Sequence, residues 1–182
     1  QSFYFQYLVV MRENPYGGNG PGRLDYYLWP YLERDLAAGT ITMDEARELI
    51  DELFVRLHER VQAADGWVEA IVVGGCHPDG SPAINPLSYL IVESIMALQQ
   101  THPSVYMRIP EDPPSEWLDM AARYMVEGHN RAQILGDRGI MAAMQWNGMP
   151  REDAAMYTCG GCMEITPQGM NSDLIFTGCQ NV

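Results

Sequence analysis

Two cysteines and a glutamate lie within six positions near the end of the chain, in the segment Cys159-Gly160-Gly161-Cys162-Met163-Glu164. In an extended segment residues i and i+2 point to the same side, so Cys162 and Glu164 would face one pocket together. A carboxylate beside a thiol raises the thiol pKa and disfavours a thiolate nucleophile. A thiyl radical needs no ionisation, and the carboxylate can take a proton from the same region of a substrate. The pair therefore predicts radical chemistry at Cys162, with Glu164 as general base.

Three alternatives stay open for the two cysteines. Their spacing is that of a dithiol redox motif, but such a motif normally opens a helix, and residues 166–169 (TPQG) oppose a helix there. A structural zinc site needs a second pair of ligands at similar spacing, and the remaining cysteines are Cys76, followed by His77, and Cys179, so zinc is weakly supported. The simplest alternative is two buried thiols in a glycine-containing turn. We expect no metal.

Three other polar residues follow predicted strands. Arg108 ends one strand and could hold a substrate carboxylate, although an arginine at such a position more often pairs with a neighbouring acid. His77 follows the glycine turn after another strand and could line the pocket or lie solvated in its loop. We take Arg108 and His77 as substrate-binding candidates, and Asp137 as an acid that fixes its loop.

The length and the net charge limit the class of protein. The 182 residues make one domain, and no apolar run approaches the ~20 residues of a membrane helix. The formal charge of −13 repels phosphate backbones and anionic membranes, so we expect a small-molecule substrate and no nucleic acid or membrane partner. All 11 basic residues are arginine, which excludes a P-loop lysine or a lysine Schiff base within this segment. The chain begins at Gln1 and stops at Val182 without a cap, so we expect a fragment of a longer protein.

Apolar periodicity and turn residues predict alternating helices and strands. We expect strands over residues 3–10, 67–73, 104–109 and 132–135, and helices over residues 23–36, 42–64, 85–99, 113–128, 140–146 and 151–157. Such alternation implies a parallel sheet and an α/β architecture. Sites in such sheets gather at strand ends and the loops after them.

The clearest helix begins at Thr42, because Thr42 and Glu45 have the spacing of a capping box. Its expected buried stripe is Ala46, Leu49, Ile50, Leu53, Leu57 and Val61. A second set of apolar side chains is expected to fill the core near the end of the chain: Met141, Met144 and Met149.

Several motifs together resemble the glycyl radical enzymes, the pyruvate formate-lyase-like superfamily. Gly161-Cys162-Met163-Glu164 resembles the family's Gly-Cys-Val-Glu active-site loop. Residues 21–31 (PGRLDYYLWPY) are similar to its PGRxDxYxxPY signature, and residues 74–90 match GGxxxDGxxxxNxLSYL. Residues 106–110 (YMRIP) correspond to its strand ending in SVRIH. In order and spacing the resemblance covers nearly all of the chain.

The resemblance implies a fold and a division of the parent protein. The family folds as a ten-stranded α/β barrel of two five-stranded parallel half-sheets, with the cysteine on a loop inside. Residues 1–182 would be a single segment supplying about half of that barrel with its surrounding helices. The C-terminal glycyl radical domain would be absent: the only Arg-Val, in Arg60-Val61-Gln62-Ala63, has alanine where the radical glycine belongs. We therefore expect the segment alone to be inactive.

The resemblance also implies a mechanism and partners. A radical S-adenosylmethionine activase would install the glycyl radical on the missing part, so no cofactor is expected to bind here directly. The radical would pass to Cys162, whose thiyl abstracts a hydrogen atom from substrate, while Glu164 deprotonates a neighbouring hydroxyl. A closed barrel suits this chemistry because it excludes water and oxygen. We expect a cytoplasmic enzyme of anaerobic metabolism that is a homodimer as a full-length protein.

The branch within the family follows from residues beside the cysteine. The formate-lyase branch has two adjacent cysteines, whereas Met163 follows Cys162 here, which disfavours pyruvate cleavage. Glutamate two residues after the cysteine fits dehydratases, other lyases and arylacetate-type decarboxylases. Ile165 replaces the proline that many members have after this glutamate, as in hydroxyproline-dehydratase-like members. We expect a dehydratase-type lyase, with decarboxylation and C–N or C–S cleavage as alternatives.

Overall fold

The structure is a computed structural model that describes residues 21–60, 70–127, 133–160 and 164–168. Within these ranges four strands form a parallel sheet in chain order: β1 (Gly22–Arg23), β2 (Ala70–Gly74), β3 (Ser104–Ile109) and β4 (Gln133–Gly136). The helices are α2 (Leu24–Ala37), α3 (Met43–Arg60), α4 (Pro86–Leu98), α5 (Ser115–Val126), α6 (Asp137–Trp146) and α7 (Arg151–Ala155). The predicted parallel α/β architecture is confirmed.

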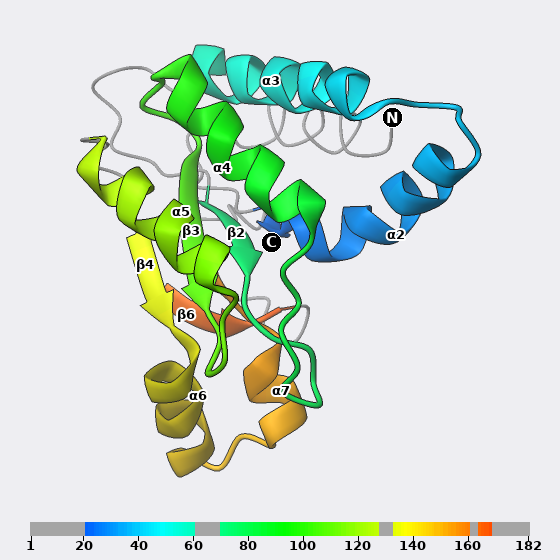
Figure 1. Cartoon of the computed structure of the whole chain (residues 1–182). Coiled ribbons are helices and arrows are strands. Elements are labelled where there is room, and N and C mark those ends of the chain that lie inside the picture. The colour runs from blue at the N-terminus through cyan, green and yellow to red at the C-terminus, as the bar shows by residue number, and fades with distance from the viewer. Residues whose placement is uncertain (1–20, 61–69, 128–132, 161–163, 169–182) are drawn as a thin grey trace, which may run out of the picture.

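An antiparallel hairpin completes the described fold. Its strands are β5 (Tyr157–Gly160) and β6 (Glu164–Pro167), and it crosses near the carboxyl end of the sheet, below α5 and above α6 and α7 in Figure 1. Three residues, 161–163, connect the two strands and lie outside the described residues.

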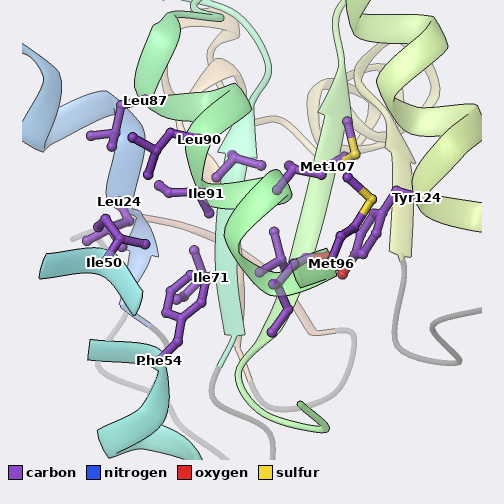
Figure 2. Packing of buried hydrophobic residues seen from close by; sticks show 14 of the residues in the cluster. Leu24, Ile50, Phe54, Ile71, Leu87, Leu90, Ile91, Met96, Met107 and Tyr124 are labelled. Atoms are coloured by element: carbon purple, nitrogen blue, oxygen red, sulfur yellow. Dashed lines mark hydrogen bonds between the residues drawn. The ribbon is translucent and has the colours of Figure 1, made fainter. Parts of the chain in front are cut away.

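One face of the sheet is covered by helices and is apolar. Ile71 and Val73 of β2, with Val105 and Met107 of β3, point into a cluster formed with α2, α3, α4 and α5. Figure 2 shows this cluster, with Leu24 and Ile50 on one side of Ile71 and Met96 and Tyr124 on the other. Each fully buried aliphatic or aromatic side chain contributes roughly 1.5–3 kcal/mol relative to exposure, so this face supplies much of the stability.

The opposite face carries a smaller and more polar core. Ala70, Val72 and Tyr106 alternate with the residues above and therefore point to the other side, where they meet α6, α7 and the hairpin. The buried charged residues Arg23, Arg108 and Asp137 also lie in this region. The predicted packing of the three methionines is confirmed: Met141 is buried here, and Met144 and Met149 pack against the cluster.

The helix starts follow their capping residues. Thr42 accepts from the Glu45 amide at 3.2 Å, and Glu45 Oε2 accepts from the Thr42 amide at 2.8 Å, which confirms the predicted capping box. Asn85 and Ser88 form a second capping box at α4, with Pro86 in the first turn. Within the described ranges, no helix combines the length and apolarity that crossing a bilayer requires.

Several boundaries and one burial prediction were wrong. Leu49 is 51% exposed, and Phe54, which is fully buried, takes its place in the stripe of α3. Helix α6 begins at Asp137, three residues before the predicted start, and Tyr157 belongs to β5 instead of the preceding helix. Arg23 pairs in β1 and was expected in a helix. The predicted strand at residues 3–10, the start of the strand at 67–69, and Val61 lie outside the described residues.

Candidate functional site

The hairpin brings Glu164 to the end of a strand next to the connecting residues. Gly160 pairs with Glu164, Cys159 with Ile165 and Thr158 with Thr166. Cys162 is the middle one of the three residues between Gly160 and Glu164 and lies outside the described residues. The predicted pairing of Cys162 and Glu164 on one side therefore stays a prediction.

The two faces of the hairpin differ in character. Tyr157 and Cys159 pack inward against the sheet and are buried, and Ile165 packs beside them. Glu164 alternates with Ile165 and so belongs to the other face, where it is half-buried. Directly paired residues share a face, and the residue paired with Glu164 is Gly160, which has no side chain.

Cys159 has the environment of a structural thiol. Burial raises its pKa to about 12, the neighbouring Arg108 charge opposes that rise, and Glu164 adds to it. A dithiol redox motif depends on a lowered thiol pKa, usually at a helix N-terminus, whereas Cys159 lies inside an antiparallel strand. The buried-thiol interpretation of Cys159 is thus the one that its surroundings favour.

Arg108 lies under the hairpin with its side chain fully buried. Its Nε and Nη2 donate to the two carboxylate oxygens of Asp137 at 2.8 and 3.0 Å. Its Nη1 donates to the Tyr157 carbonyl at 2.9 Å, and Nη2 also donates to the Ala155 carbonyl at 3.1 Å. Burial lowers the pKa of Arg108, but the Asp137 hydrogen bonds together with the charges of Tyr157, Asp137 and Cys76 outweigh burial, and the net shift is upward. The alternative role of pairing with a neighbouring acid is what the structure shows; direct substrate contact stays a prediction.

Asp137 was expected to fix a loop, but it is the first residue of α6 and its carboxylate binds groups of two other elements. It is buried in the first turn of α6 and, besides binding Arg108, accepts from the Tyr157 hydroxyl at 2.8 Å. Asp137 therefore joins the end of β4 to both β3 and the hairpin.

Arg23 is a site residue that the sequence reasoning did not single out. Its guanidinium donates to the carbonyls of Gly74 at 3.0 Å and Cys76 at 3.1 Å, and to that of Ala155 at 3.3 Å. Burial first, and then the nearby positive charge of Arg108, lowers the pKa of Arg23 to about 10. The signal for Arg23 was its place in the PGR stretch at residues 21–23.

His77 lies in the loop after β2 and is half-buried. Its ring centroid is 5.4 Å from that of Tyr26, whose other neighbour is the Arg23 guanidinium at 4.3 Å from the ring centre. His77 thus belongs to the loop beside Arg23, and its contact with a substrate stays a prediction.

A cavity of about 200 Å³ opens at the carboxyl ends of β2, β3 and β4, where sites of α/β sheets gather. Its lining includes Cys76, Asp137, Arg138, Met141 and Arg151. Burial raises the pKa of the Cys76 thiol, and Asp137 raises it further. Among the described residues, no three or more His, Cys, Asp or Glu side chains group as metal ligands.

The fold defines a class of protein: a parallel α/β sheet with an antiparallel hairpin, β5 and β6, at its carboxyl end. The family described as "PFL-like: Pyruvate formate lyase-like" matches residues 1–182. The chain therefore belongs to this family, the glycyl radical enzymes.

Curated relatives and solved structures agree with this assignment. The chain is 30% identical to an isethionate sulfite-lyase of Nitratidesulfovibrio vulgaris, covering 79% of this chain and 19% of the relative. It is 26% identical to a trans-4-hydroxy-L-proline dehydratase of Clostridioides difficile, covering 100% of this chain and 24% of the relative. The B12-independent glycerol dehydratase of Clostridium butyricum matches with a TM-score of 0.81 at 28% identity, covering 92% of this chain and 22% of that chain. The chain spans 19 to 24% of the length of these relatives. It is therefore part of the α/β barrel of a glycyl radical enzyme.

Proposed function

We propose that the full-length protein containing this chain is a radical-based lyase that eliminates a leaving group from a small hydroxylated or amino-acid-like substrate. The observation that carries the proposal is the hairpin geometry, which sets Glu164 on the face away from the packed Cys159, at the strand end that directly follows residues 161–163. A general base must face the substrate, and the alternation along the strand turns the Glu164 carboxylate away from the packed core.

The proposed chemistry balances over one cycle. The family's glycyl radical, on a part of the protein outside this chain, supplies the unpaired electron, and a radical S-adenosylmethionine activase installs it. The Cys162 thiyl takes a hydrogen atom from the hydroxyl-bearing carbon and becomes a thiol, leaving a carbon radical. Glu164 takes the hydroxyl proton, and the resulting ketyl radical expels the leaving group from the next carbon with its bonding electrons. The product radical then takes the hydrogen atom back from Cys162, and the Glu164 proton leaves with the expelled group.

The leaving group stays open among related reactions. Relatives include an isethionate sulfite-lyase and the glycyl radical subunit of a 4-hydroxyphenylacetate decarboxylase, so C–S cleavage and decarboxylation are the alternatives to dehydration. We also propose a homodimer as the assembly of the parent protein. Cys162 and Glu164 hold the same roles in each alternative that begins with hydrogen abstraction beside a hydroxyl.

A substrate panel with three variants tests the proposal. The activated full-length parent would be given small diols, hydroxyprolines and hydroxysulfonates under anaerobic conditions, and products would be followed by mass spectrometry. We expect Cys162→Ala to abolish turnover, and Glu164→Gln to lower kcat roughly 10²–10⁴-fold, the usual contribution of a general base. Cys159→Ala is the matched control and retains turnover. Turnover that survives Cys162→Ala, or is lost equally in Cys159→Ala, would contradict the assigned roles.

A further inference from the structure

The base of the hairpin is held to the sheet by directional polar contacts. Arg108 donates to the carbonyls of Ala155 and Tyr157, and Arg23 donates to the same Ala155 carbonyl. Gln168, which follows β6, donates its amide to the Met156 carbonyl at 3.0 Å. Both ends of the hairpin are thus bonded to buried groups of β1 and β3 or to the turn before β5.

Arg108 itself has little freedom to move. Both Asp137 oxygens hold it, and its Cζ lies 3.7 Å from the centre of the Tyr157 ring. Gly75 also lies close, because an added Cβ there would lie 2.5 Å from Arg108 Nε. The guanidinium is therefore held by the Asp137 carboxylate and packed against the Tyr157 ring, with no space for a side chain at Gly75.

Tyr157 closes this network through its hydroxyl, which donates to the Asp137 oxygen that Arg108 Nε also binds. The closed set links β3 through Arg108, α6 through Asp137 and β5 through Tyr157. Burial strongly raises the pKa of the Tyr157 hydroxyl, so it stays a neutral donor at physiological pH. The first residue of the hairpin is consequently locked to the sheet by its carbonyl, ring and hydroxyl together.

We propose that Arg108, Asp137 and Tyr157 are positioning residues that set the hairpin strands, and with them Glu164, at the place over the sheet that proton transfer to Glu164 requires. This inference rests on the proposed radical-lyase function. Reaction geometry is demanding: a misplacement of about 1 Å can cost about 10²-fold in rate. In this proposal the network acts on rate through the position of the hairpin.

Tyr157→Phe tests the network because it removes one hydroxyl and leaves the ring against Arg108. Tyr124→Phe is the matched control: Tyr124 is also buried, and its hydroxyl donates to the Val105 carbonyl at 3.2 Å, on the helix-covered face. In the activated full-length parent we expect Tyr157→Phe to lower kcat at least 10-fold with KM within 2-fold of the parent. The glycyl radical signal in electron paramagnetic resonance, per protomer, is expected to stay unchanged. Both variants are expected to lower Tm by similar amounts, and Tyr124→Phe is expected to leave kcat unchanged.

Amide hydrogen exchange separates this inference from the proposed function. Tyr157→Phe is expected to speed exchange in residues 157–160 and 164–168 at least 10-fold and to leave residues 70–74 unchanged, whether or not a substrate is known. If the wild-type parent forms the radical but turns over no lyase substrate, the proposed function is wrong. Faster hairpin exchange in Tyr157→Phe would still support the positioning network in that case. Unchanged exchange in Tyr157→Phe, or a kcat loss matched by Tyr124→Phe, would overturn the network.

Discussion

The two faces of the parallel sheet are built on different principles. The helix-covered face is packed with aliphatic and aromatic side chains from α2, α3, α4 and α5. The hairpin-covered face adds two buried arginines and a buried aspartate to a smaller apolar cluster. Apolar burial is non-directional and tolerates small shifts, whereas buried charges need partners at fixed distances. The contrast suggests that the first face supplies stability and the second supplies precision for the hairpin that carries the proposed site.

Burying two guanidiniums on the hairpin-covered face costs free energy, and it also requires partners at fixed positions. Arg23 and Arg108 converge on the Ala155 carbonyl, and each lies near the other's positive charge. Only Asp137 pairs directly with one of them among the described residues. Carbonyl oxygens accept from the Nη groups of both arginines, and the Met156 sulfur also accepts from Arg23 Nη1, whereas Arg23 Nε is buried with no hydrogen-bond partner among the described residues. A site that needed stability alone would be better served by apolar residues of similar volume.

The largest expected effect comes from breaking the buried ion pair. Arg108→Met leaves the Asp137 carboxylate buried without its partner, which should lower the free energy of unfolding by about 3–5 kcal/mol. Urea denaturation measures the loss. The matched control is Arg123→Met, because Arg123 pairs with Glu127 at 3.4 Å with side chains 59% and 40% exposed. The control should lose less than about 1 kcal/mol. Equal losses in the two variants would remove the contrast between the faces.

Truncating a buried side chain on the helix-covered face should lower the free energy of unfolding. Phe54→Ala removes a fully buried ring from the cluster and is expected to cost about 3 kcal/mol, from lost burial and the cavity left behind. Leu49→Ala, on the same helix but half exposed, should cost less than about 1 kcal/mol. Thermal and urea unfolding of the two variants compare them. If Leu49→Ala proved as costly as Phe54→Ala, the assigned core face of α3 would be wrong.

Gly75 follows β2 and lies against Arg108, so replacing Gly75 tests how tightly the Arg108 guanidinium is held on the hairpin-covered face. Gly75 has φ +80°, and an added Cβ would lie 2.5 Å from Arg108 Nε and 2.6 Å from Cζ. Gly75→Ala should therefore cost about 2–3 kcal/mol, from left-handed strain plus displacement of the guanidinium. Gly39→Ala shares the positive φ, at +66°, but meets nothing within 4 Å, so it should show the strain alone, about 1 kcal/mol. A difference near zero between the two would mean that Arg108 gives way without cost.

The helix-covered face was largely predictable because its signals are local. The strand over 104–109 was placed to the residue, α4 followed its predicted range within one residue at each end, and the Thr42 cap was read from a four-residue motif. The one wrong member of the α3 stripe, Leu49, lies at the border of the apolar arc, where periodicity alone cannot tell which neighbour is covered.

The hairpin-covered face was less predictable because its contacts join residues far apart in the chain. Arg23 reaches Ala155 across 132 positions, and Arg108 reaches Tyr157 across 49. No local pattern marks such bonds, so the sequence predicts a helix at Arg23 and a helical turn at Tyr157. The antiparallel hairpin itself is signalled only by residues 157–167, which are too short and glycine-rich for a strong strand pattern.

The smallest expected effect comes from removing the N-cap of α3, a helix of the apolar face. Thr42→Ala removes the hydroxyl that accepts from the Glu45 amide and should cost about 1 kcal/mol at neutral pH, the usual value for an N-cap. Bonds from the Thr42 amide and hydroxyl hold the pKa of Glu45 below its ordinary range. A lowered carboxyl pKa gives stability that is present above the ordinary pKa and is lost as pH falls through the lowered value. The gap between wild type and Thr42→Ala should therefore narrow below about pH 4. Thr40→Ala is the control, since the Thr40 hydroxyl donates to the Asp35 carbonyl, which does not titrate, and its cost should be independent of pH.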